Sequence, residues 1–199
     1  MIAARAGKAK PMSSEATLIL SAMSAGDRSG TDRLIELVYG DFRQLANKYL
    51  GHETRSNTLQ PTAVVHEVFL KLVDQDKVDW RGRSHFFAVG ATAMRHLLVD
   101  HARRKGAQKR GGERQRIALD EDLIVSPESD EDVLALDEAL KKLAAIDSQR
   151  ARIVELRFFG GLTNDEVAEV LDVSKRTIQK QWAGTRVWLR SELSEPTEE

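Results

Sequence analysis

The chain has 199 residues, enough for one packed core or two small ones. Lys and Arg number 30 against 31 Asp and Glu, and this near-balance argues against a uniformly basic coat protein and against an acidic tail protein. The absence of cysteine excludes disulfides and thiolate metal sites, and it is compatible with a reducing, cytoplasmic location. Since no apolar run approaches the roughly 20 residues of a membrane-spanning helix, we expect no membrane association.

The first 13 residues are basic and lack the apolar stretch of a secretory signal. We therefore expect a loose leader over residues 1–13, outside the folded core. Initiation at Met12 instead of Met1 stays open.

Most of the chain has apolar side chains three and four residues apart, which is the spacing of one helix face. This pattern runs through residues 34–49, 65–72, 86–98 and 133–143. Gly26, Gly51 and Gly106 are expected near helix ends, and Pro61 is expected at the start of a helix. Sustained alternation with a period of two, the sign of a half-buried strand, is absent. The spacing predicts an all-α protein.

Charged side chains are grouped in blocks along the chain. Residues 95–116 hold eight basic and two acidic side chains, whereas residues 117–138 hold nine acidic and no basic ones. Residues 174–190 hold five basic side chains and no acidic one. Two basic segments separated by an acidic one indicate two polyanion-binding surfaces and a linker, with plain solvated faces as an equal alternative on charge alone.

The charge blocks and helix breaks divide the chain into two helical domains joined by a flexible acidic linker. Each domain has about four helices, which can bury their apolar faces against one another. The expected parts are a leader (1–13), a first domain (14–108), the linker (109–131), a second domain (132–192) and an acidic tail (193–199).

Residues 163–166, Thr-Asn-Asp-Glu, form a capping box, in which each of the two end side chains accepts a hydrogen bond from the other residue's amide. A short helix follows, with the small Ala168 where two helices touch. Asp172 lies at the turn, where Gly is usual, and Ser174 caps a second helix that runs to about Arg190. This spacing is that of a helix-turn-helix, whose second helix enters the major groove of DNA.

The second helix presents basic and polar side chains outward, while Ile178 and Trp182 face inward. Arg and Lys can bind guanine edges or phosphates, and Gln can pair with adenine. The candidate DNA-binding residues of this helix are Ser174, Lys175, Arg176, Thr177, Gln179, Lys180 and Arg186. A helical hairpin with an ordinary solvated face is the alternative.

Residues 162–178 resemble region 4 of bacterial sigma factors. Residues 59–72 resemble region 2.2, and residues 86–104 resemble regions 2.3 and 2.4. A third domain between them would not fit, and two domains alone are the layout of the extracytoplasmic-function (ECF) group. The resemblance covers residues 14–192, and the order and distance of its motifs make it specific.

The resemblance implies a transcription initiation factor that performs no catalysis and uses no cofactor or metal. In this family, region 2 docks on the clamp helices of the RNA polymerase β′ subunit and captures the −10 promoter element as a single strand. Region 4 lies near the β flap and reads the −35 element. The implied partners are polymerase core and promoter DNA, and the free protein is expected to be a monomer. Whether an anti-sigma factor is a further partner stays open.

The helix over residues 59–73 is the expected polymerase contact. Its polar side chains beside the apolar stripe are Gln60, His66, Glu67 and Lys71. Ala63 and Val64 depart from the family, in which acidic residues are common at these positions. Some polymerase contacts are therefore expected to be apolar or to lie elsewhere.

The −10 strand is expected to contact the segment from Trp80 onward, where aromatic and basic residues alternate. Trp80 and His85 are the aromatic side chains expected to be exposed for base stacking, worth ~1–3 kcal/mol per base. At least one of Phe86 and Phe87 is expected in the core. The expected −10 contacts are Trp80, Arg83, His85, Arg95, His96, Arg103 and Arg104, continued by Lys105.

Two other classes of function are weaker alternatives. A helix-turn-helix repressor or activator would bind duplex DNA without polymerase and would use residues 59–73 as a dimer face. An enzyme has little support, because Leu70 stands where a zinc-protease motif starting at His66 needs its second His.

The acidic block at residues 117–138 suggests one more role. A flexible segment can fold back on a basic surface and mask it from stray DNA until polymerase pulls the two domains apart. A plain solvated tether is the favoured alternative, because blocks of like charge are usually solvated.

Overall fold

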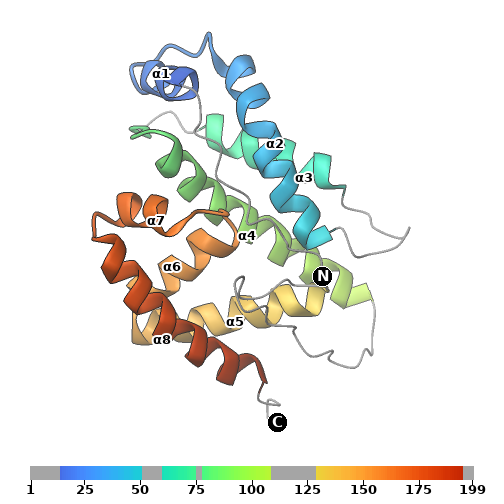
Figure 1. Cartoon of the computed structure of the whole chain (residues 1–199). Helices are drawn as coiled ribbons and strands as arrows, with labels where there is room; N and C mark the ends of the chain where they lie inside the picture. The colour runs from blue at the N-terminus through green and yellow to red at the C-terminus, as the bar shows by residue number, and fades with distance from the viewer. Residues whose placement is uncertain (1–13, 51–59, 75–77, 109–128, 195–199) are drawn as a thin grey trace, which may run out of the picture.

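The computed structural model describes residues 14–50, 60–74, 78–108 and 129–194 (Figure 1). These segments form eight helices and no strand, which confirms the predicted all-α class. The helices are α1 (Ser14–Ser24), α2 (Thr31–Leu50), α3 (Pro61–Val73), α4 (Arg83–Gln108), α5 (Asp130–Ile146), α6 (Ser148–Phe158), α7 (Asn164–Leu171) and α8 (Lys175–Ser194). The predicted leader, the linker up to residue 128 and the tail from residue 195 lie outside the described residues.

Local signals in the sequence set several helix ends. Pro61 occupies the first turn of α3, as predicted, where its missing amide proton costs no hydrogen bond. Gly26 follows α1 with φ of +93°, a conformation that favours glycine. Ser129 and Asp132 form a capping box, with amide-to-side-chain distances of 3.2 and 3.1 Å, and α5 therefore begins slightly before residue 132.

The first half of the chain packs around an aromatic cluster. Phe42 of α2 stacks on Phe87 of α4 with ring centroids 4.6 Å apart, and it meets Phe86 edge-on at 6.1 Å. Phe86 and Phe87 are both buried, which confirms the prediction that at least one lies in the core. A Cβ on Gly90 of α4 would lie 2.8 Å from the Phe42 ring, so the glycine allows this close approach.

The two halves of the chain share one continuous core. Helix α4 packs against α5, α6 and α7 as well as against α1 and α3 (Figure 1), and buried side chains from α1 to α8 belong to a single cluster. Consecutive residues of α4, such as 86–88 and 97–99, are all buried. A helix that is apolar on more than one side needs partners on more than one side. The helices of the two halves therefore bury surface against each other as well as among themselves.

The halves also approach each other closely just after α6. A Cβ on Gly160 would lie 3.1 Å from the Cβ of Ala91 in α4 and 2.6 Å from the carbonyl oxygen of Leu156. Nearby, the buried Tyr49 of α2 donates a hydrogen bond from its hydroxyl to the carbonyl oxygen of Phe158. Burial raises the pKa of Tyr49, so the phenol stays protonated as this donor requires.

The close approach at Gly160 can be tested with a single methyl group. Gly160→Ala should lower the free energy of unfolding by about 1–3 kcal/mol, because the added methyl group would meet a backbone carbonyl oxygen and the Cβ of Ala91 rather than the end of a flexible side chain. Gly40→Ala is the control, since no atom lies within 4 Å of its added Cβ in the middle of α2, and it should stabilise by up to about 1 kcal/mol. Urea unfolding measures both, and an unchanged Gly160→Ala variant would contradict the close approach.

Candidate nucleic-acid interface

Helices α7 and α8 form the predicted helix-turn-helix. Glu166 donates its amide to Oγ1 of Thr163 at 3.3 Å, and the Glu166 carboxylate accepts from the Thr163 amide at 2.9 Å. The predicted capping box is thus confirmed. Ser174 caps α8 by accepting from the amide of Thr177 at 3.1 Å, and Ile178 of α8 is fully buried. The caps fix the first residues of both helices, and the burial of Ile178 fixes which side of α8 faces the core.

Asp172 makes the turn between the two helices in a left-handed conformation, with φ of 53° and ψ of 47°. Among the described residues it is the sole non-glycine with positive φ. Its amide donates to the carbonyl oxygens of Ala168 and Glu169, which closes the end of α7. The sequence placed Asp172 at this turn correctly, in the position where Gly is more usual.

Helix α8 is fixed on α6 by side chains at its middle. The Arg157 guanidinium of α6 lies over the ring of Trp182, 3.9 Å from its centroid. Burial, together with the nearby charge of Arg186, lowers the pKa of Arg157 to about 10, so the group is still a cation at neutral pH. Gln181 donates its side-chain amide to Oε1 of Gln149 at 2.9 Å. The recognition helix is therefore anchored on its inner side and free on its outer side.

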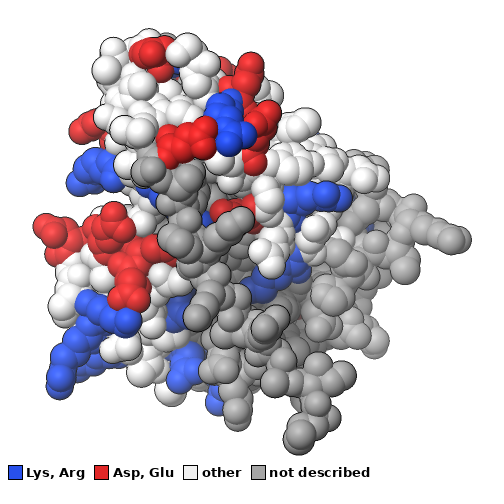
Figure 2. Space-filling model, turned by 45° about the horizontal axis from the view of Figure 1, so that its top comes forward, with Lys and Arg blue, Asp and Glu red and all other residues white. Residues whose placement is uncertain are grey.

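The outer side of α8 carries the predicted DNA-binding side chains. Lys175, Arg176, Gln179 and Lys180 are all exposed. Lys175 pairs with Asp165 of α7 at 2.8 Å, whereas neither Arg176 nor Lys180 has an ion-pair partner within the described segments. At the left edge of Figure 2 a basic patch lies beneath an acidic one, on the side where Figure 1 places α7 and the start of α8.

A groove of about 640 Å³ runs beside the first turns of α8. Its lining residues are Arg150 of α6 and Ser174, Arg176, Thr177, Lys180, Gln181 and Gly184 of α8. The lining thus combines three cations and two hydroxyls with no carboxylate, which suits a sugar-phosphate backbone. Arg150 is absent from the sequence-based set, because it lies far from the recognition helix in the chain and reaches it only in the folded structure.

The predicted polymerase-binding residues of α3 share one exposed surface. Gln60, His66, Glu67 and Lys71 are all exposed, and Glu67 and Lys71 pair at 3.7 Å. Leu70 lies between them with 57% of its surface exposed, which is unusual for a large apolar side chain. Polar groups around an apolar centre are the typical composition of a protein-binding surface.

Trp80 contradicts the expectation that it is exposed. It is 5% exposed, its ring lies 5.1 Å from that of Phe86, and its amide donates to Oγ of Ser24 at 2.8 Å. The segment before α4 folds back on α1 and places Trp80 in the core. His85 is half-buried beside it, with ring centroids 5.9 Å apart. Burial, with a smaller contribution from Arg81, lowers the pKa of His85.

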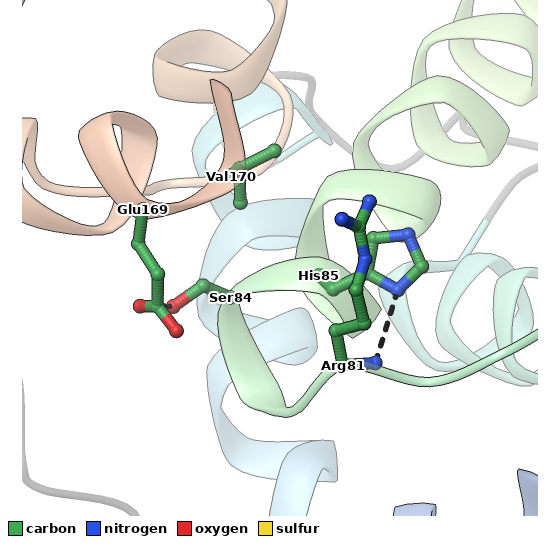
Figure 3. Close-up of a pocket in the computed structure, with 5 residues that line it drawn as sticks. All are labelled: Arg81, Ser84, His85, Glu169 and Val170. Carbon is green, nitrogen blue, oxygen red and sulfur yellow. Dashed lines mark hydrogen bonds between the residues drawn. The ribbon is translucent and has the colours of Figure 1, made fainter. Parts of the chain in front are cut away.

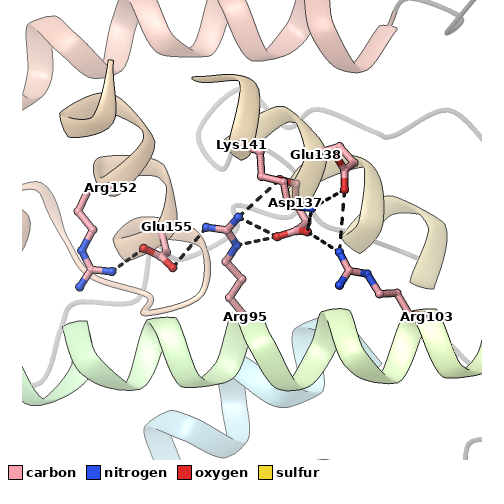
Figure 4. A network of polar contacts seen from close by, with 7 residues as sticks. All are labelled: Arg95, Arg103, Asp137, Glu138, Lys141, Arg152 and Glu155. Atoms are coloured by element: carbon pink, nitrogen blue, oxygen red, sulfur yellow. Dashed lines mark hydrogen bonds and ion pairs between the residues drawn. The ribbon is translucent and has the colours of Figure 1, made fainter. Parts of the chain in front are cut away.

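The predicted −10 cations in the middle of α4 face the second half of the chain (Figure 4). Arg95 donates from Nε and Nη2 to one oxygen of Asp137 of α5 at 2.9 and 2.7 Å, and Nη1 lies 3.5 Å from Glu155 of α6. Arg103 reaches the other oxygen of Asp137 at 3.3 Å. Lys105, further along α4, pairs with Asp130 at 2.8 Å. All three were expected on a free surface. Carboxylates of α5 and α6 hold Arg95 and Lys105 in partly buried positions instead, whereas the paired Arg103 side chain is still 53% exposed.

Asp137 is the centre of this network. Burial raises the pKa of its carboxyl group, but hydrogen bonds from Lys141 and Arg95 outweigh burial and hold the pKa below its ordinary value of 3.8. The carboxylate is therefore ionised at neutral pH, which its two arginine contacts require. Its side chain is only 7% exposed, so water screens these pairs weakly.

The start of α4 makes a similar contact with α7. Arg83 pairs with the Glu166 carboxylate and lies 3.1 Å from Asp41 of α2, and its guanidinium is 4.4 Å from the Phe87 ring centroid. Ser84 donates its hydroxyl to Glu169 at 2.7 Å.

A cavity of about 60 Å³ remains between α4 and α7, and Figure 3 shows the side chains around it. Its lining residues are Arg81, Ser84, His85, Glu169 and Val170. This volume admits water and is too small for a nucleotide base.

The remaining predicted −10 residues lie on the outside of α4. His96 and Arg104 are exposed, and Arg104 donates from Nε to the carbonyl oxygen of Asp100 at 3.1 Å.

In the described part of the chain, no cluster of three or more His or acidic side chains could hold a metal ion. No helix there is long and apolar enough to cross a membrane.

A helix-turn-helix with unpaired cations beside a basic groove defines a DNA-binding protein. The family profile for ECF sigma factors matches residues 13–195, and the chain belongs to this family. Its members are non-enzymatic factors that act in transcription initiation with RNA polymerase core and promoter DNA. No curated protein matches the sequence significantly.

The left-handed turn allows a test of the helix-turn-helix itself. Asp172→Gly should raise the free energy of unfolding by about 1 kcal/mol, because an L-residue in this conformation costs ~1–2 kcal/mol that glycine avoids. Asp172→Asn, which tolerates the same conformation, controls for the lost charge and should stay close to the parent. A destabilised Asp172→Gly variant in chemical unfolding would contradict the turn.

Proposed function

We propose that this protein directs RNA polymerase core to a subset of promoters by reading the −35 element with α8 and holding the melted −10 strand with α4. The observation that supports this most is the groove of about 640 Å³ between Arg150 and the exposed cations of α8. Opening of the duplex is then driven by binding energy for unpaired bases, with no chemical step on this chain.

Recognition of the −35 element is assigned to the start of α8. Arg176, Gln179 and Lys180 are exposed on the outer side of α8, and the contact of Trp182 with Arg157 anchors this helix on its inner side. The backbone positions of the three residues are therefore fixed, while their side chains are accessible to DNA. Side chains of this kind reach base edges in the major groove. Arg150, from α6, is assigned to a backbone phosphate at the groove wall, beside the carboxylate of Asp147 with which it pairs at 3.3 Å.

Polymerase binding is assigned to the surface of α3 around Leu70. The surface is exposed on a helix whose other side, with Val64 and Val68, is fully buried, so its geometry is fixed by the core. An apolar centre with a rim of His66, Glu67 and Lys71 suits packing against the β′ clamp helices. Ala63 and Val64 stand where acidic residues are common in the family. Ala63 is exposed and Val64 is buried, so only Ala63 is accessible to a partner.

The −10 strand is assigned to α4 and the residues before it. His96 and Arg104 are exposed as the structure stands, while Arg83, Arg95 and Arg103 would have to leave their carboxylate partners. In-vitro transcription with core polymerase on genomic fragments tests the whole proposal. Promoter-specific transcripts that need the protein support it, and their absence with intact holoenzyme contradicts it.

Alanine variants of the recognition helix test the −35 assignment. Arg176→Ala and Lys180→Ala should each lose ~1–3 kcal/mol of binding to the preferred −35 duplex in the holoenzyme if they read bases. Arg190→Ala, an exposed cation of the same helix outside the groove, is the control and should bind like the parent. Equal losses on all sequences would make them phosphate contacts, and unchanged binding would contradict the assignment.

A charge reversal tests the polymerase surface. Glu67→Lys should weaken association with core polymerase by about tenfold, because it repels a neighbouring cation and alters the rim of the surface. Glu36→Lys is the matched control, since Glu36 is also exposed and also pairs with a cation one turn away, on α2. Fluorescence titration with core polymerase measures both, and equal affinities would contradict the assignment.

A further inference from the structure

We propose that Asp165 of α7 is a specificity-determining residue of the DNA-binding surface. Its carboxylate holds Lys175 and repels DNA phosphates from α7, so that a duplex binds through the outer side of α8 and the groove alone. Asp165 acts by repulsion and touches no base. The inference rests on the proposed function, which assigns −35 recognition to α8.

The charges of the helix-turn-helix are separated between its two helices. Helix α7 carries the acids Asp165, Glu166 and Glu169 and no cation. Residues 175–180, at the start of α8, carry three cations and no acid. In Figure 2 the acidic patch and the basic patch lie next to each other at the left edge. The first helix of such a motif crosses the DNA backbone, and carboxylates there oppose this contact.

Asp165 is the acid of α7 that pairs with α8 within the described residues. Glu166 belongs to the capping box, and Glu169 accepts from the hydroxyl of Ser84. Asp165 pairs with Lys175 at 2.8 Å, and the two side chains are 66% and 53% exposed. Exposed pairs of this kind contribute little to stability. The pair therefore acts mainly on the charge that this surface presents to DNA.

The pair makes the two flanks of α8 electrostatically different. Thr177 and Lys180 line the groove, whereas Lys175 lies toward α7, about 200° around the helix axis from Thr177. On the groove flank a phosphate meets Lys180, which has no ion-pair partner within the described segments. On the α7 flank it meets a cation whose charge a carboxylate already offsets.

This asymmetry favours one position of the duplex over others. In the preferred complex, base contacts of Arg176 and Gln179 determine the register, and the phosphates lie on the groove flank. On other sequences no base contact determines the register, and α7 is a neighbouring surface that the backbone could approach. Repulsion by Asp165 penalises those complexes and leaves the preferred one nearly unchanged, which is how an unfavourable contact produces specificity.

Removal of the charge at Asp165 tests this role. The holoenzyme with Asp165→Asn should bind a promoter duplex with a scrambled −35 element on the order of fivefold more tightly than the parent does, with a larger gain at low salt. Binding to the unaltered promoter should change by less than about twofold. Fluorescence anisotropy with the two labelled duplexes measures the ratio of their Kd values, and core polymerase alone gives the binding that does not depend on this chain.

Two further variants separate charge from structure. Asp165→Glu keeps the charge and should keep the ratio of the parent. Glu36→Gln is the matched control, because Glu36 of α2 is 65% exposed and pairs with Arg33 at 2.7 Å outside the helix-turn-helix. It should bind both duplexes like the parent. Urea unfolding of Asp165→Asn should match that of the parent, since its capping box is unaltered.

The possible outcomes distinguish this inference from the proposed function. An Asp165→Asn variant with the parent ratio overturns the inference. A ratio that falls only because the unaltered promoter binds more weakly also overturns it, since Asp165 would then position Lys175 for recognition instead of repelling phosphates. The proposed function is contradicted separately, if the parent holoenzyme binds the scrambled duplex as tightly as the unaltered one.

Discussion

The arrangement of the whole molecule depends on α4 being in contact with both halves of the chain. Its apolar residues pack on α1 and α3 on one side and on α5, α6 and α7 on the other, around Phe87 and Ala91. Between these apolar contacts its cations meet fixed carboxylates, of which Asp137 is the most buried. Partly buried ion pairs add little net stability, because desolvation offsets much of their attraction. The apolar packing therefore contributes most to holding the halves together, and the ion pairs join particular cations of α4 to particular carboxylates of α5, α6 and α7.

The helix-turn-helix depends on different, local interactions. Its capping box, its left-handed Asp172 and its Ser174 cap all form between residues no more than four apart. Such contacts do not need the other half of the chain. The helix-turn-helix can therefore keep its structure whether or not α7 touches α4.

This division between local and distant contacts also explains what the sequence could predict. Pro61 at a helix start, the Thr163 capping box and the turn at Asp172 were predicted correctly, because neighbouring residues cause them. The burial of Trp80 was missed, since it depends on Ser24 of α1, 56 residues earlier. The pairing of Arg95 with Asp137, 42 residues away, was missed for the same reason. Periodicity identifies a charged face on a helix and carries no information about what covers it.

The acidic block of residues 117–138 is a charge pattern whose contacts the sequence alone predicts only in part. The sequence suggested acids that fold back on a basic surface, and the part of this block that the structure describes, residues 129–138, does lie against α4. Acids on a flexible segment would be screened beyond about 8 Å at physiological salt and would attract cations without selecting partners. Asp130 and Asp137 instead belong to α5, which a capping box starts at a fixed residue and which core packing holds in place. Rigid acids at 2.7–2.8 Å from particular cations select those cations, and a change in the position of α5 alters all of these pairs together.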